Sequence, residues 1–70
     1  MEVEIRQEDE FIKLGQALKK AGFAGSGVDA KMIIQDGRVT VNGEIEERRG
    51  KKLYPGDIVS FEGESFKIVK

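Results

Sequence analysis

Residues 26–43, SGVDAKMIIQDGRVTVNG, carry in order the signals of a short helix, a helix stop, a strand and a tight turn. Ser26 is a good N-cap residue, and Asp29 gives the spacing of a capping box with Asp in place of Glu. Gly37 is typical of a helix end, because glycine adopts positive φ without strain. We therefore predict a helix over residues 27–36, which is too short to be stable alone and must pack on another helix.

The residues that follow predict a small sheet. Residues 38–41 alternate in polarity, and Asn42-Gly43 is favoured by a type I′ hairpin turn, because both of its central residues take positive φ. The return strand of this hairpin begins with residues 44–46. The remaining signals are a type II turn at Pro55-Gly56, a strand over residues 58–61 and a strand over residues 66–69.

Upstream, apolar residues recur at helical spacing, which predicts the partner helix over residues 10–21 with Asp9 as its N-cap. Its apolar stripe consists of Phe11, Leu14, Leu18 and Ala21. Gly15 lies inside this helix at a cost of about 1 kcal/mol relative to alanine, which indicates close packing at that position. Before the helix, Val3 and Ile5 alternate with charged residues and predict a short strand at a sheet edge.

The predicted order is strand, helix, helix and four strands. This order favours the α+β class, with two short packed helices on one face of a small, mostly antiparallel sheet. The length of 70 residues allows a single domain over residues 1–70. We expect a monomer, because the outer strands are short and charged.

The composition excludes several kinds of chemistry. The chain has no Cys and no His, which removes thiolate nucleophiles, disulfides, zinc fingers and the usual general base at neutral pH. We therefore expect no catalytic residue, no metal, no cofactor and no enzymatic activity. No apolar run approaches the roughly 20 residues of a membrane span, so we expect a cytoplasmic domain without a membrane partner.

The small net charge of −1 hides a segregation of charges. Residues 1–10 hold five acidic residues and one arginine, whereas residues 48–52, RRGKK, hold four cations in five positions. Such a run is often only a solubility feature, but nucleic acid responds to the local field rather than to the net charge.

Further cations lie where they could join this run. Lys13 and Lys31 are on the two predicted helices, and Arg38 follows the second. Together with the run at residues 48–52, which lies in a predicted charged loop over residues 47–52, they would form a phosphate-binding groove at the N-terminus of the second helix. There Ser26 is either a simple cap or also a backbone phosphate contact. The residues that we predict to bind RNA are Lys13, Ser26, Lys31, Arg38, Arg48, Arg49, Lys51 and Lys52.

The stretch KLGQALKKAGFAGSGVDAKMIIQDGRVTVNG, continuing to KLYPGDIVSF, resembles the S4 RNA-binding domain over residues 11–61. The S-G-x-x-A-K helix and the RRGKKLYPGD run are still more similar to short stand-alone bacterial proteins of the YaaA/YbcJ type. The resemblance implies the S4-like fold (αL motif), with two packed helices on a strongly bent sheet. It also implies binding to structured ribosomal or transfer RNA.

The match is not complete at two basic positions. Lys13-Leu14-Gly15 stands where the family often has Arg-Leu-Asp, and Ser26-Gly27 stands where it often has Ser-Arg. The basic residue later in the second helix is retained as Lys31. The chain lacks the aromatic sets of single-strand binders, so we expect recognition of RNA shape.

We therefore predict an RNA-binding module whose partner is ribosomal or transfer RNA, with the ribosome as a candidate site. The alternative is a protein-interaction module that docks on a ribosomal or replication component without binding RNA.

Overall fold

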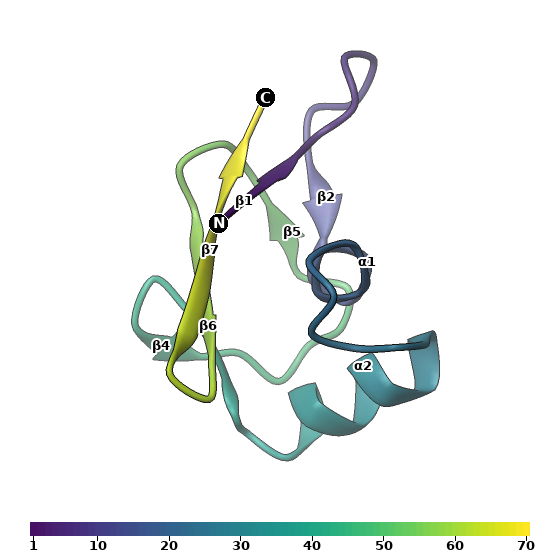
Figure 1. The fold of residues 1–70 in the computed structure, drawn as a ribbon, viewed down its shortest axis with the longest axis vertical. Helices are drawn as coiled ribbons and strands as arrows, with labels where there is room; N and C mark the ends of the chain where they lie inside the picture. The colour runs from purple at the N-terminus through teal and green to yellow at the C-terminus, as the bar shows by residue number, and fades with distance from the viewer.

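Two helices and seven strands follow one another along residues 1–70, all of which the computed structural model describes (Figure 1). The elements are β1 (Glu2–Glu4), β2 (Ile12–Lys13), α1 (Leu14–Lys20), α2 (Gly27–Gln35), β3 (Val39–Val41), β4 (Glu44–Ile45), β5 (Lys52–Leu53), β6 (Ile58–Phe61) and β7 (Glu64–Val69). Neither helix is long and apolar enough to cross a membrane.

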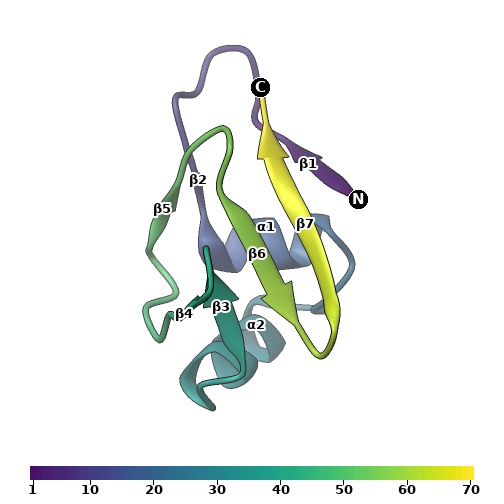
Figure 2. The ribbon, with the colours of Figure 1, turned by 90° about the vertical axis from the view of Figure 1, so that its left-hand side faces the viewer.

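The main sheet has five strands in the order β1-β7-β6-β3-β4. Strand β1 runs parallel to β7, and the other neighbours are antiparallel. Figure 2 shows both helices on one side of β3, β6 and β7. The predicted α+β class, the mostly antiparallel sheet and the edge position of the first strand are confirmed. Strands β2 and β5 form a separate antiparallel pair.

The core lies between the helices and the main sheet. Helix α1 contributes Leu14 and Leu18, helix α2 contributes Ile34, and the sheet contributes Phe66 and Ile68, all almost completely buried. No polar or charged residue is buried. The stability of the fold therefore depends on apolar packing rather than on buried polar networks.

The local signals of residues 26–43 produce the predicted elements. The Ser26 hydroxyl accepts a hydrogen bond from the Asp29 N–H at 3.1 Å, which caps α2. Gly37 ends this helix with φ of 74°. Asn42 and Gly43 have φ of 53° and 86°, as a type I′ turn requires.

The predicted start of the first helix is wrong. Helix α1 begins at Leu14 instead of residue 10, and its N-cap residue, Lys13, makes no side-chain capping bond. The backbone N–H groups of Leu14 and Gly15 instead donate to carbonyl oxygens of Lys51 and Arg49, at 2.9 and 3.0 Å. A loop distant in sequence thus replaces a local cap. The two residues before α1, Ile12 and Lys13, form strand β2 and pair with β5.

Three residues therefore lie in other elements than the sequence predicts. Asp9 is not an N-cap and forms an ion pair with Arg6 at 2.8 Å. Phe11 lies before β2 and outside the helical stripe. Lys52, predicted to lie in a loop, belongs to strand β5.

Candidate nucleic-acid interface

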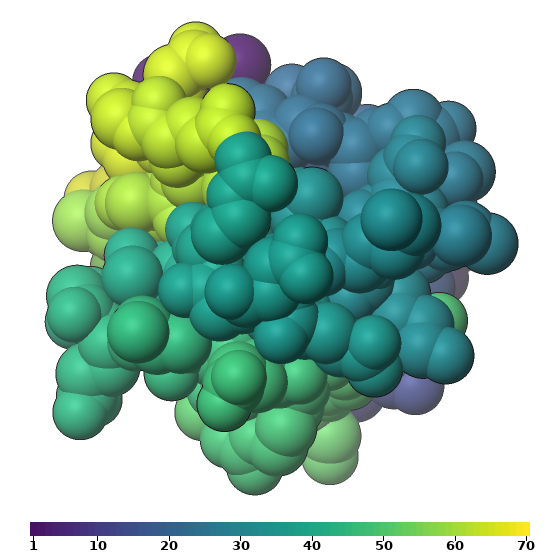
Figure 3. All heavy atoms as spheres, turned by 90° about the horizontal axis from the view of Figure 1, so that it is seen from below, coloured from purple at the N-terminus to yellow at the C-terminus, as the bar shows by residue number.

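A hollow of about 280 Å³ lies between the first turns of α1 and α2 and the loop over residues 48–52. We call this hollow the basic groove and the loop the basic loop. Figure 3 shows the segments around residues 30 and 50 on one face of the molecule. The residues that line the basic groove are Lys13, Gly15, Gln16, Lys19, Gly27, Ala30, Arg49 and Gly50. They include three cations and no acid, so the field in the basic groove favours an anion.

The basic loop is held against α1 by its own backbone. Its carbonyl oxygens cap α1, and the N–H of Lys51 donates to the carbonyl of Arg48 at 3.2 Å. The aliphatic stem of Arg49 lies on Gly15, where a Cβ would come within 2.6 Å of the Arg49 Cγ. The close packing predicted for Gly15 is confirmed, and it sets the position of Arg49 at the groove.

The pairing of β2 with β5 places two like charges opposite each other. Lys13 and Lys52 are register partners in the antiparallel pair. Like charges directly opposite on a strand pair are unfavourable by up to about 1 kcal/mol. The Lys52 ammonium lies over the ring of Phe11, 4.9 Å from its centroid. The fold therefore holds positive charge together at this edge of the groove, where a bound anion would relieve the repulsion.

Helix α2 opens at the same groove. Its first residue, Gly27, is among the lining residues, and the preceding Ser26 uses its hydroxyl to cap the helix. The N-terminal end of a helix carries a partial positive charge and unpaired backbone N–H groups. This end adds to the field of the three cations.

Three other predicted cations lie in the basic loop but outside the groove. Arg48, Lys51 and Lys52 line an adjoining hollow of about 430 Å³, which shares Gly50 with the groove and also includes Tyr54. The Arg48 guanidinium donates to both carboxylate oxygens of Glu46, at 2.9 and 3.2 Å. Its charge is thus partly neutralised within the chain.

The structure does not bring Lys31 and Arg38 into the groove. Lys31 is exposed on α2 and lines none of the hollows. Arg38 forms an ion pair with Glu62 and lies over the Phe61 ring, 5.1 Å from its centroid. Arg38 therefore belongs to the neighbourhood of the turn between β6 and β7.

Two lining residues were missed from the sequence. Gln16 and Lys19 follow Lys13 at intervals of three residues, a spacing that places them along one side of a helix. This spacing is the signal in the sequence that could have identified both residues.

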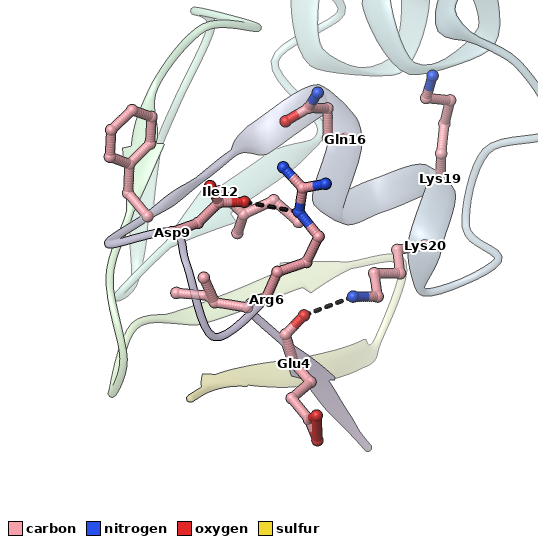
Figure 4. A pocket seen from close by; sticks show the side chains of 9 residues that line it. Glu4, Arg6, Asp9, Ile12, Gln16, Lys19 and Lys20 are labelled. Atoms are coloured by element: carbon pink, nitrogen blue, oxygen red, sulfur yellow. Dashed lines mark hydrogen bonds and ion pairs between the residues drawn. The ribbon is translucent and has the colours of Figure 1, made fainter.

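A larger hollow of about 610 Å³ lies between residues 4–12 and α1 (Figure 4). Its charges are mixed, with Glu4 and Asp9 beside Arg6, Lys19 and Lys20. Arg6 pairs with Asp9, which raises the pKa of Arg6, and the Lys20 ammonium donates to the carbonyl of Glu4. This hollow is therefore less suited to a polyanion than the basic groove.

The ion pair at the start of the basic loop predicts a pH effect on stability. The hydrogen bonds from Arg48 lower the pKa of Glu46 below its usual range. A carboxyl group with a lowered pKa stabilises the fold above its unfolded pKa of about 4.3 and loses that contribution as the pH falls. We expect Glu46→Gln to reduce the free energy of unfolding at pH 7, with the difference from wild type shrinking toward pH 3. Urea titrations at several pH values test this, and a difference that is constant with pH would contradict it.

Two short helices packed on one face of a small, mostly antiparallel sheet, with a cationic loop against the first helix, define a small α+β module. The sequence profile of the S4 domain matches residues 3–69, and the chain belongs to the S4 domain family.

Among similar proteins, the probable ribosome maturation protein RlbA of Bacillus subtilis is 48% identical over 63 residues, covering 89% of each chain. The putative RNA-binding protein YbcJ of Escherichia coli is 40% identical over 58 residues, covering 83% of each. The solution structure of YbcJ, described as revealing an αL motif involved in RNA binding, matches with a TM-score of 0.70 and 34% identity. That match covers 96% of this chain and 84% of that one. These likenesses confirm the resemblance that the sequence indicated.

Proposed function

We propose that the chain binds structured RNA, of the ribosomal or transfer RNA class, through phosphate contacts in the basic groove. The observation that carries this function is a groove with three cations and no acid, in a chain whose net charge is −1. Membership of the S4 domain family and the names of RlbA and YbcJ support it.

In this function Lys13, Lys19 and Arg49 neutralise phosphates that lie in the groove. The guanidinium of Arg49 can bind a phosphate through two parallel hydrogen bonds, and the first turn of α2 offers backbone N–H groups beside it. Because these contacts go to the backbone of the RNA, they read its shape rather than its sequence.

The other residues predicted to bind RNA lie outside the groove or support it. Lys31, Lys51 and Lys52 would contact phosphates beyond the groove, and Ser26 would orient the first turn of α2. Arg48 and Arg38 would contribute less, because Glu46 and Glu62 already neutralise part of their charge.

The test is the salt dependence of binding. We expect the wild-type chain to bind a fluorescent hairpin RNA more tightly than a duplex DNA of equal length. With about three to five phosphate contacts, the affinity for RNA should fall roughly 40- to 500-fold between 50 and 200 mM salt. Fluorescence anisotropy measures both quantities. Equal affinity for DNA would contradict a preference for RNA, and no binding at 50 mM salt would contradict the function itself.

A second candidate function is docking to a protein component of the ribosome or the replication machinery. It is favoured by Val28 and Met32, which lie one turn apart on α2 with exposed fractions of 67% and 58%. If the chain fails to bind RNA at low salt, a pull-down that depends on Met32 would support this function instead.

A further inference from the structure

Two aromatic side chains from distant parts of the chain meet beside the basic loop. The register of β2 and β5 pairs Ile12 with Leu53, so the flanking residues Phe11 and Tyr54 come opposite each other. Their ring centroids are 6.0 Å apart, with the planes inclined by 53°. Phe11 is half-buried, whereas Tyr54 remains 48% exposed.

The exposure of the Tyr54 ring is not explained by the turn that follows it. That turn is held by backbone and carboxylate groups, because Asp57 accepts a hydrogen bond from the Tyr54 N–H at 2.8 Å and donates its own N–H to the Tyr54 carbonyl at 3.0 Å. Any residue except proline can make these two bonds at position 54. The turn therefore does not require the aromatic ring, which packs on Phe11 and remains accessible to a ligand.

Tyr54 lines two hollows of different charge. One, of about 460 Å³, is also lined by Glu44, Glu46 and Asp57. The other, which Tyr54 lines with the basic loop, contains Arg48, Lys51 and Lys52 and no acid. The same hollow shares Gly50 with the basic groove, so a nucleic acid in the groove has a path to the ring. An aromatic surface bordered by cations is the combination that binds unpaired nucleotides, since the ring stacks on the base and the cations neutralise the phosphate.

We infer that Tyr54, supported by Phe11, is a stacking site for an unpaired nucleotide at the border of a paired RNA segment. This inference rests on the proposed function, because the groove must hold the paired segment. Lys51 and Lys52 neutralise the phosphate of the unpaired nucleotide. The site has no preference among the four bases, because every base offers a face for stacking.

The experiment compares two hairpin RNAs that differ only in one bulged position, which carries either adenine or an abasic nucleotide. Both RNAs have the same phosphates, so only stacking distinguishes them. The proteins are wild type, Tyr54→Phe, which keeps a ring, and Tyr54→Leu, which keeps apolar bulk against Phe11. We expect wild type and Tyr54→Phe to prefer the adenine bulge by about 10-fold, and Tyr54→Leu to bind both RNAs alike.

A second readout follows from the composition. Tyr54 is the single tyrosine of the chain, and there is no tryptophan, so the intrinsic fluorescence reports on this ring alone. We expect the adenine bulge to quench the wild-type fluorescence more strongly than the abasic bulge does at equal saturation.

The possible outcomes separate this inference from the proposed function. Wild-type binding that is equal for the two bulges, or a preference that survives in Tyr54→Leu, overturns the stacking site and leaves the groove function intact. Failure of wild type to bind either hairpin at low salt overturns both.

Discussion

Replacing Lys13 and Arg49 together by glutamate (K13E/R49E) is expected to weaken binding to structured RNA about 100-fold or more. Both residues line the basic groove, Lys13 from β2 and Arg49 from the basic loop. A hydrogen bond to a charged group contributes roughly 1.5–3 kcal/mol, so the loss of two phosphate contacts alone reaches this range. The reversed charges then repel the phosphates. Anisotropy titration with the hairpin RNA measures the change, which should be accompanied by a flatter salt dependence.

The same substitutions should leave the fold intact. A glutamate at position 13 faces Lys52 in the β2–β5 pair, so it replaces a repulsive cross-strand pair by an attractive one. We expect the melting temperature to stay the same or to rise slightly, which circular dichroism can follow. A matched control is K67E/K70E, which makes the same change in net charge at an exposed residue of β7 and at the exposed residue that follows the strand. An equal loss of RNA affinity in the control would show that total charge, not the groove, determines binding.

Replacing Phe66 by alanine (F66A) is expected to unfold most of the protein at room temperature. Phe66 is 1% exposed at the centre of the core, where its ring meets that of Phe23 edge-on, with centroids 5.3 Å apart. Loss of a buried phenylalanine side chain costs about 3–5 kcal/mol, and a core of this size supplies a total stability of the same order. Far-UV circular dichroism during thermal and urea unfolding measures the effect.

Phe66→Leu serves as the control for this substitution. Leucine keeps most of the apolar volume, so we expect a cooperative transition at a lower midpoint. A cooperative transition of F66A close to the wild-type midpoint would mean that the neighbours refill the space left by the ring.

The elements that could be predicted from the sequence are those whose signals are local. Helix α2 is determined by Ser26 at one end and Gly37 at the other, and the hairpin by Asn42-Gly43, all within a few residues of the structure that they produce. The start of α1 could not be predicted in this way. It depends on carbonyl groups of Arg49 and Lys51, which reach Gly15 and Leu14 only after the chain has folded back.

The same distinction applies to the candidate site. The sequence placed Lys13 near the basic loop because Lys13 belongs to a predicted helix that packs on the second one, and the structure places Lys13 and Arg49 at one groove. Lys19 joins them because it follows Lys13 and Gln16 at intervals of three residues, along one side of α1. Arg38 is adjacent in sequence to the end of α2, but Glu62 and Phe61 hold it elsewhere. Proximity of charges along a chain therefore predicts their proximity in space only within one turn or one element.

The capping of α1 by the basic loop has a consequence for the rate of binding. Because the loop's carbonyl groups are already engaged by Leu14 and Gly15, the loop is ordered before any ligand arrives. Little conformational entropy remains to be lost from the backbone when RNA docks, and no refolding step has to precede the contact. We therefore expect association in a single concentration-dependent phase, which low ionic strength accelerates because opposite charges attract. We also expect that differences in affinity among RNAs arise mainly from their dissociation rates.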